Sequence, residues 1–280
     1  MPYMDPEAVP HGRGARGRAW SQYLPKAIPA GRVIRLKERS LVMLTNDLIL
    51  RNPLRLLGHE NEDIIAPGQF GAVLARAGVG KTALIVQIAL NSMLRGRNVL
   101  HISLNEPVGK VDIRYQEVLG RLAQQYQVSH MQQLWETVLP HRFIMTFQVE
   151  GFSAPKLEER LTDLMSQDIF HPHMIIIDGQ PFDVDAQKTL DELKALAQKL
   201  SLPIWFTITT HRHEAPSADG LPIQLSPVKA LFDVAIALQP RAETIYIEAI
   251  KGCTLPETQP PLVFDPATML IQTKNIQGER

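Results

Sequence analysis

A short run containing two glycines lies between an apolar segment and a longer apolar stretch. The run is Ala75-Arg76-Ala77-Gly78-Val79-Gly80-Lys81-Thr82, and residues 71–74 before it and 83–90 after it are almost entirely apolar. This order predicts a strand, a glycine turn and a helix, which is the setting of a phosphate-binding loop, or P-loop. In such a loop, consecutive backbone N–H groups surround a phosphate, the helix N-terminus contributes partial positive charge, and a lysine contributes a full one.

The chemistry expected of this run is the binding of a nucleoside triphosphate together with magnesium. Lys81 is expected to bridge the phosphates, and the hydroxyl of Thr82 is expected to contact Mg²⁺. Ala75 stands where the motif has its first glycine, and it is small enough for many such loops. The residues expected to bind the cofactor ATP are Arg76, Ala77, Gly78, Val79, Gly80, Lys81, Thr82 and Ala83.

A second candidate, Asp178, ends the apolar run Met174-Ile175-Ile176-Ile177. A carboxylate in this place is typical of the Walker B role, in which it holds Mg²⁺ through Thr82 or through a water molecule. The alternative is a strand-end aspartate that begins a turn. Because ligands collect at the carboxyl ends of parallel strands, we expect Asp178 and Lys81 to face one crevice.

Two further strand ends carry polar residues that complete the catalytic candidates. Glu106 follows the strand expected at 98–104, where a carboxylate would lie beside the γ-phosphate and polarise the attacking water. Its alternative role is to complement the dipole of the next helix. Thr210 and His211 end another apolar strand and are expected to sense the γ-phosphate through hydrogen bonds. The alternative for this pair is the start of an ordinary loop.

The elements that must position these residues alternate along the chain from about residue 60. We expect strands at 70–75, 98–104, 142–149, 174–177 and 204–208, and helices at 81–95, 108–125, 153–165 and 186–200. Later strands at about 233–238, 244–250 and 269–273 are expected to form hairpins at one edge of the sheet. This alternation predicts an α/β fold with a mostly parallel central sheet flanked by helices. Before it, residues 41–58 are expected to form one or two short helices packed on the core.

Composition limits the class of protein. The chain has 280 residues, 29 basic and 29 acidic side chains, and one cysteine, so its formal net charge is zero. Balanced charge does not point to nucleic acid, although a local loop can carry enough charge to bind it. Cys253 alone cannot form an internal disulfide, which suits a reducing compartment. No apolar run reaches about 18 residues and no signal core is visible, so we expect a cytoplasmic protein without a membrane segment.

The first 40 residues differ from the rest and are treated as a separate extension. They contain five prolines and a short basic, glycine-rich tract at 11–18. This composition is typical of a flexible leader. The alternative is an arm that contacts a neighbouring subunit or an anion. Residues 41–280 are expected to form one domain.

Taken together, the motifs resemble those of the RecA-like P-loop ATPases, the core shared by DnaB-type helicases, RadA and KaiC. The resemblance spans about residues 60–275 and is carried by Ala66–Gly71, the glycine run, Ser103–Pro107, Asp178–Gln180, Thr209–Arg212, Ile250–Gly252 and Pro260–Pro266. It implies a RecA-like fold with ATPase activity. It also implies assembly into a ring or filament, in which the late hairpin with Lys251 contacts a neighbouring subunit's nucleotide.

Two positions depart from that family pattern. Asn105 stands where helicase relatives carry the catalytic glutamate, and Glu106 follows one place later. If Asn105 occupies the catalytic position, hydrolysis is slow or absent. Cys253 stands where the helicase pattern has an arginine two residues after Lys251. The missing arginine weakens the case for a processive motor more than the case for ATP binding.

Three classes of function stay open on the sequence. The favoured one is a nucleotide-driven switch that acts on a protein partner. The others are a nucleic-acid motor, in which the loop at 213–226 contacts DNA, and a phosphotransferase. A GTPase is disfavoured because Thr273-Lys274-Asn275-Ile276 lacks the aspartate of a guanine-reading motif. A metal site at the pairs His171/His173 and His211/His213 is disfavoured because they lack Cys or acidic partners at ligand spacing.

Overall fold

The computed structural model describes residues 45–57, 63–128, 130–183, 186–211, 214, 216–253 and 260–274. All of them belong to one compact unit, Ser40–Arg280. The expectations for the extension at residues 1–40, including its basic tract, lie outside the described residues.

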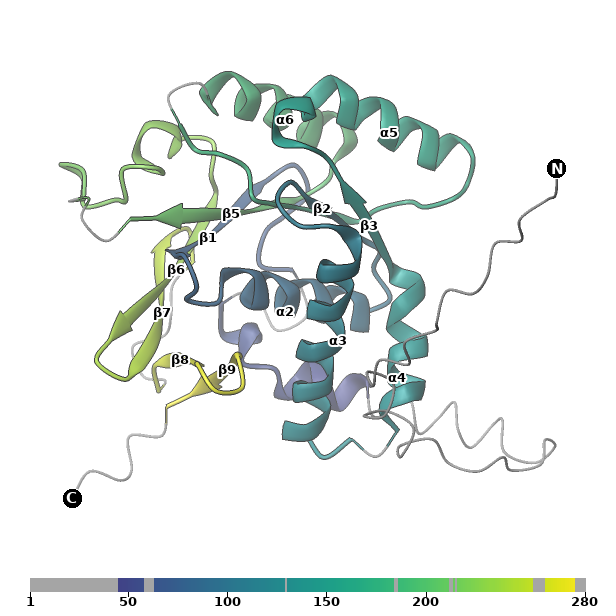
Figure 1. The fold of residues 1–280 in the computed structure, drawn as a ribbon, viewed down its shortest axis with the longest axis vertical. Helices are drawn as coiled ribbons and strands as arrows, with labels where there is room; N and C mark the ends of the chain where they lie inside the picture. Colours follow the sequence, from purple (N-terminus) through teal and green to yellow (C-terminus); the bar gives the residue numbers. More distant parts are fainter. Residues whose placement is uncertain are drawn as a thin grey trace, which may run out of the picture. The chain divides into compact units, whose positions relative to one another are not determined.

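A nine-stranded sheet forms the centre of the described part of the chain, as Figure 1 shows. The strands run in the order β3-β2-β4-β5-β1-β6-β7-β8-β9. Those from β3 through β6 pair in parallel, and those from β6 to β9 pair antiparallel. Their bounds are Phe70–Arg76 (β1), Val99–Ser103 (β2), Arg142–Thr146 (β3), Met174–Asp178 (β4), Ile204–Thr210 (β5), Val234–Arg241 (β6), Thr244–Lys251 (β7), Leu262–Asp265 (β8) and Leu270–Thr273 (β9).

Helices cover both faces of this sheet, so the expected α/β architecture with a mostly parallel sheet and C-terminal antiparallel strands is confirmed. The helices α5 and α6 lie on one face, and α2, α3 and α4 lie on the other (Figure 1). Their bounds are Lys81–Leu94 (α2), Val108–Gln125 (α3), Met131–Val138 (α4), Ala154–Ser166 (α5) and Ala186–Leu200 (α6). Short 3-10 turns lie at Pro53–Leu57 (η2), Leu139–His141 (η3), Val149–Gly151 (η4) and Ser226–Val228 (η5).

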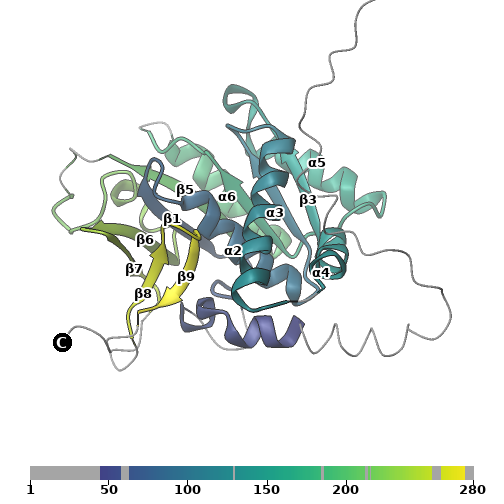
Figure 2. The same ribbon diagram turned by 60° about the horizontal axis from the view of Figure 1, so that its bottom comes forward.

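Residue patterning explains which helix faces are buried. The buried side chains of α3 are the expected stripe, Val111, Tyr115, Val118, Leu119 and Leu122, with Ala123. In contrast, α2 is buried at every position from Ala83 to Leu94, because other elements pack around it as well as the sheet. A helical segment at 45–51 and η2 lie along the side of α2 that faces away from the sheet (Figure 2).

Several boundaries differ from the sequence prediction for local physical reasons. The strand expected at 142–149 stops at Thr146, since the chain turns into η4 before α5. Ser153 takes the N-cap position of α5 as expected, but its side chain makes no capping hydrogen bond. The short helix α4 and the strand β8 were not predicted. Within the described residues, every helix is too short or too polar to span a lipid bilayer.

A fully buried histidine lies between the sheet and α3. His101, on β2, is 0% exposed, and its Nδ1 lies 3.0 Å from the hydroxyl of Tyr115. Arg142, on β3, stacks its guanidinium 4.7 Å from the centre of the Tyr115 ring. Burial lowers the pKa of His101 to about 4; the charge of Asp178 opposes this shift, and that of Arg142 adds to it.

We predict that stability falls as the pH drops from about 6.5 to about 4, because the unfolded chain binds a proton that folded His101 excludes. His101 makes its full contribution to stability above the pKa that it has in the unfolded chain. The loss over the window is about 3 kcal/mol, since one pKa unit corresponds to about 1.4 kcal/mol. Urea unfolding of the wild type and of His101→Gln at pH 7 and pH 4.5 measures it. An equal pH dependence in both proteins would contradict the prediction.

Candidate functional site

The glycine turn connects the end of β1 to the start of α2. Arg76 ends the strand and Lys81 begins the helix. Both glycines have left-handed backbone angles, with φ of 78° at Gly78 and 115° at Gly80, a region that L residues with a Cβ rarely adopt. Gly80 is the N-cap of α2, and no side chain caps this helix. The first-turn N–H groups have no partner within the helix, so they are available to an anion.

Lys81 is folded back over this turn. Its Nζ donates to the carbonyl oxygens of Ala75 and Arg76, at 3.1 and 3.2 Å. Burial lowers the pKa of Lys81, and the nearby carboxylate of Asp178 partly offsets the shift. The ammonium group is thus held beside the uncapped helix start, where it adds to the positive potential of the helix dipole.

Asp178, at the end of β4, is fixed by hydroxyl groups from two other elements. Its Oδ2 accepts a hydrogen bond from Thr82 Oγ1, on α2, at 3.1 Å. Its Oδ1 accepts one from Thr207 Oγ1, on β5, at 2.5 Å. The Thr207 hydroxyl also accepts the N–H of Gly179 at 3.1 Å. Asp178, Thr82 and Lys81 therefore lie near one another at the carboxyl ends of the strands.

Thr207 is a site residue that the sequence analysis did not single out. The parallel pairing of β4 with β5 places Ile177 opposite Phe206, so Thr207 follows at the level of Asp178. The available signal was a threonine inside an otherwise apolar strand at 204–208. A polar residue there needs a partner when it is buried, and Thr207 is only 3% exposed.

Glu106 and Asn105 occupy different surroundings at the start of α3. The backbone N–H of Glu106 donates to Ser103 Oγ at 3.0 Å, and its carboxylate lies 3.8 Å from Lys110 Nζ. Asn105 packs against the turn after Asp178: a Cβ on Gly179 would lie 2.3 Å from Asn105 Nδ2. Of these two side chains, Asn105 contacts the turn after Asp178, whereas Glu106 faces Lys110 on α3.

Thr210 and His211 also lie at the carboxyl ends of the strands. They are beside the glycine turn and not beside Asp178. Thr210 pairs with Arg76 in the β1–β5 register. Thr210, His211 and Arg76 line a pocket of about 300 Å³, together with Ile223, Gln224 and other residues of the following loop. Within the described residues, no hydrogen bond joins Thr210 or His211 to Asp178 or Thr82. Arg212 and His213 lie outside the described residues.

Lys251, on β7, is occupied by contacts within its own chain. Its Nζ donates to the carbonyl oxygens of Lys229 and Phe232, at 2.6 and 2.5 Å. The next residue, Gly252, has φ 73°, and a Cβ there would lie 1.7 Å from the Asp233 carbonyl oxygen. Burial raises the pKa of the neighbouring Cys253 thiol to about 11. This thiol therefore stays protonated near neutral pH.

The two histidines before β4 contact neighbouring segments of the chain. His173 Nδ1 accepts the N–H of Asn98 at 3.0 Å, and His171 Nε2 lies 2.8 Å from Asp168 Oδ1. Within the described ranges, no group of three or more His, Cys, Asp or Glu side chains is arranged to hold a metal ion.

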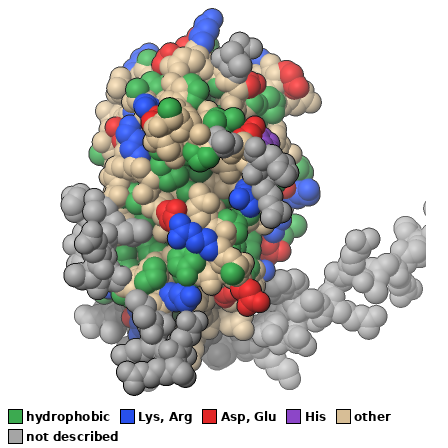
Figure 3. Space-filling model, turned by 90° about the vertical axis from the view of Figure 1, so that its left-hand side faces the viewer, with side chains coloured by type: hydrophobic (Ala, Val, Ile, Leu, Met, Phe, Trp, Pro, Cys, Tyr) green, Lys and Arg blue, Asp and Glu red, His purple; other side chains and the backbone are tan. Residues whose placement is uncertain are grey.

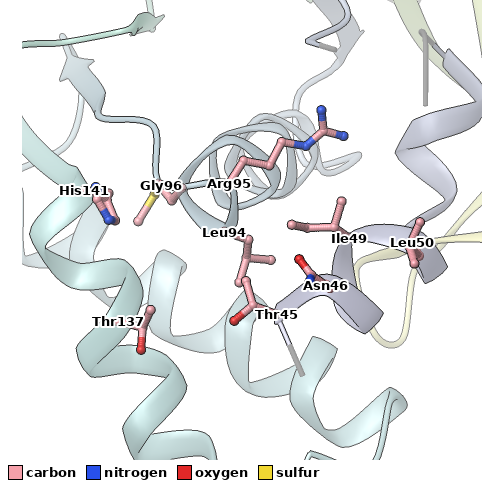
Figure 4. Close-up of a pocket in the computed structure, with 10 residues that line it drawn as sticks. Thr45, Asn46, Ile49, Leu50, Leu94, Arg95, Gly96, Thr137 and His141 are labelled. Atoms are coloured by element: carbon pink, nitrogen blue, oxygen red, sulfur yellow. The ribbon is translucent and has the colours of Figure 1, made fainter. Parts of the chain in front are cut away.

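A larger hollow lies at the opposite end of α2 (Figure 4). It measures about 650 Å³. The helical segment at 45–51, the end of α2 and the α4–η3 region line it. Since 14 residues of helix span about 20 Å, this hollow is separate from the glycine turn.

We predict that Thr207→Val destabilises the protein by about 1–3 kcal/mol, because it leaves the Gly179 N–H without its acceptor and Asp178 without one donor. The change conserves shape, so a packing defect does not explain a loss of this size. Thr209→Val on the exposed position of the same strand is the matched control. Chemical denaturation of both variants measures the difference, and equal stabilities would refute the role given to the Thr207 hydroxyl.

No model of a known protein family matches this chain, and no curated protein sequence matches it significantly. The case for a function therefore depends on how four residues are arranged: Lys81, Thr82, Asp178 and Thr207.

Proposed function

We propose that this protein binds ATP with Mg²⁺ and hydrolyses it slowly, as a RecA-like P-loop ATPase that acts as a switch on a protein partner. One observation carries the proposal. The Thr82 hydroxyl lies 3.1 Å from the carboxylate of Asp178, at the end of β4. Thr82 is in the first turn of α2, which follows the glycine turn and has no side-chain cap. A hydroxyl and a carboxylate brought together beside free helix N–H groups and a lysine match what Mg²⁺ and phosphates require.

The backbone of the turn and Lys81 would bind the phosphates. Gly78 and Gly80 carry no Cβ atoms that could obstruct their N–H groups, and a Cβ at Gly78 would meet no atom within 4 Å. Lys81 would exchange its two carbonyl contacts for phosphate oxygens. The residues 76–83 thus fit an anion of high charge, and binding is favoured by the helix dipole as well as by the ammonium group.

Thr82 and Asp178 would hold the metal ion. Both offer oxygen atoms, the ligands that Mg²⁺ prefers, and one or two protein ligands are usual for this ion in nucleotide sites. Thr207 would keep the Asp178 carboxylate turned toward Thr82. When bound, Mg²⁺ neutralises charge on the β- and γ-phosphates.

Slow hydrolysis follows from the start of α3. Glu106 is the candidate that orients water, but its carboxylate is engaged with Lys110 at 3.8 Å. Asn105, which packs against the Asp178 turn, can accept and donate hydrogen bonds but is not a base. Positioning and charge neutralisation would therefore supply most of the rate enhancement. Thr210 and His211 would report loss of the γ-phosphate from the pocket beside the turn.

A protein partner is favoured over nucleic acid by charge. The net charge is zero, and basic and acidic side chains are interspersed on the face drawn in Figure 3, which carries the ends of β5 and β7. A nucleic-acid motor more often shows a continuous basic surface. The alternatives are a DNA-dependent ATPase and a phosphotransferase, and assembly into a ring or filament belongs to the same proposal.

We expect Lys81→Ala to abolish Mg-ATP binding, because the ammonium group that would bridge the phosphates is lost. Titration with a fluorescent ATP analogue measures this. Lys188→Ala, an exposed lysine on α6, is the control and should bind like the wild type. Retained binding by Lys81→Ala would remove the glycine turn from the site.

Glu106→Gln is expected to bind ATP normally and to stop the remaining turnover, because an amide cannot take a proton from water. Phosphate release under single-turnover conditions measures the step. Glu117→Gln, on the exposed side of α3, should turn over ATP at the wild-type rate. If Glu106→Gln also keeps the wild-type rate, another residue has the role.

Single-stranded DNA should change ATP turnover less than tenfold if the protein is a switch. A stimulation of tenfold or more, which corresponds to about 1.4 kcal/mol in the barrier, would instead favour the motor. Transfer of labelled phosphate from ATP to the protein or to an added acceptor would identify the phosphotransferase.

A further inference from the structure

The hairpin formed by β8 and β9 folds over the first half of α2, as Figures 1 and 2 show. The ring of Phe264 occupies the space beside the glycine turn. A Cβ on Gly80 would lie 2.4 Å from Phe264 Cε1 and 3.2 Å from the Met269 methyl carbon. The hairpin therefore packs directly on the backbone whose N–H groups are proposed to bind phosphate.

A buried amide joins the hairpin to the helix. Gln87, on α2, is 2% exposed. Its Nε2 donates to the Met269 carbonyl at 3.0 Å, and its Oε1 accepts the N–H of Ile271 at 3.0 Å. This side chain thus pairs with the outer side of β9 as a neighbouring strand would. Burying an amide is unfavourable unless it is hydrogen-bonded, so these two hydrogen bonds hold the hairpin and α2 together.

The turn between β8 and β9 is itself constrained. The Asp265 carboxylate accepts the Thr268 hydroxyl at 2.7 Å and the Ala267 N–H at 2.9 Å, and the first of these contacts lowers the pKa of Asp265 most. Met269 has a left-handed φ of 58°. From α3, Arg121 Nη1 donates to the Thr268 carbonyl at 3.0 Å. The hairpin therefore links the start of α2 to the C-terminal part of α3.

We propose that the β8–β9 hairpin positions the glycine turn for phosphate binding, with Gln87 and Arg121 as positioning residues, and that nucleotide binding in turn orders the hairpin. The inference rests on the proposed function. Coupling between two sites is reciprocal. If the ordered hairpin raises nucleotide affinity by some factor, bound nucleotide favours the ordered hairpin by the same factor. Phe264 transmits the effect because it touches Gly80 at the point where the helix N–H groups begin.

The test uses the full chain and compares Gln87→Met and Arg121→Met with the wild type. Gln87→Met keeps the length of the side chain and removes both hairpin contacts, and we expect it to weaken Mg-ATP binding about tenfold. Arg121→Met removes one partly exposed contact and should weaken binding in the same direction but less. Leu193→Ala, in the core on the other face of the sheet, is the control for lost stability. At a comparable drop in melting temperature it should keep the wild-type affinity.

Hydrogen exchange separates positioning from a merely structural role. In the wild type, Mg-ATP should slow the exchange of amides in residues 262–273. In Gln87→Met this slowing should be lost, while that at residues 77–83 is retained at saturating nucleotide. Wild-type affinity in Gln87→Met and Arg121→Met, or an unchanged effect of nucleotide on the hairpin, overturns the inference alone. If the wild type does not bind Mg-ATP, the proposed function is overturned as well.

Discussion

The carboxylate of Asp178 is the point at which the central elements of this structure meet. One oxygen is bonded by Thr82 on α2 and the other by Thr207 on β5, while Asp178 itself ends β4. These contacts require β4 and β5 to be neighbours and α2 to start at the same edge of the sheet. The strand order satisfies this, since β5 lies between β4 and β1, and α2 follows β1 directly. Two hydroxyl groups thereby hold the Asp178 carboxylate in one orientation at the end of β4.

Much of the fold could be predicted from local pattern. Apolar runs bounded by glycine or polar residues indicated the parallel strands, and α3 and α6 were predicted with the bounds that they have. The brief amphipathic segment of α4 offers only two buried residues, Leu134 and Val138, so its periodicity is weak. Likewise, β8 is four residues long and follows two prolines, which gives little alternation to recognise.

Site residues could be predicted where they belong to one continuous motif. They were harder to predict where segments far apart in the sequence come together. Lys81 and Thr82 follow from the glycine run, and Asp178 follows from its apolar strand. Thr207 depends on the register between two strands, and Gln87 depends on a hairpin that begins some 180 residues later. Asn105 and Glu106 are adjacent in sequence, and only the local backbone decides which of them faces the Asp178 turn. Pairings of this kind are set by tertiary packing, which no single segment encodes.

The amide of Gln87 has a consequence for how this sheet meets other chains. A terminal strand ordinarily presents unpaired N–H and C=O groups that invite strand addition and aggregation. At the start of β9, two of these groups, the Ile271 N–H and the carbonyl of the preceding residue Met269, are already bonded to the Gln87 side chain. The opposite margin is β3, whose outward side adjoins no further strand of the described sheet. At the β9 margin, two of the backbone groups that an added strand would need are therefore already paired within the chain.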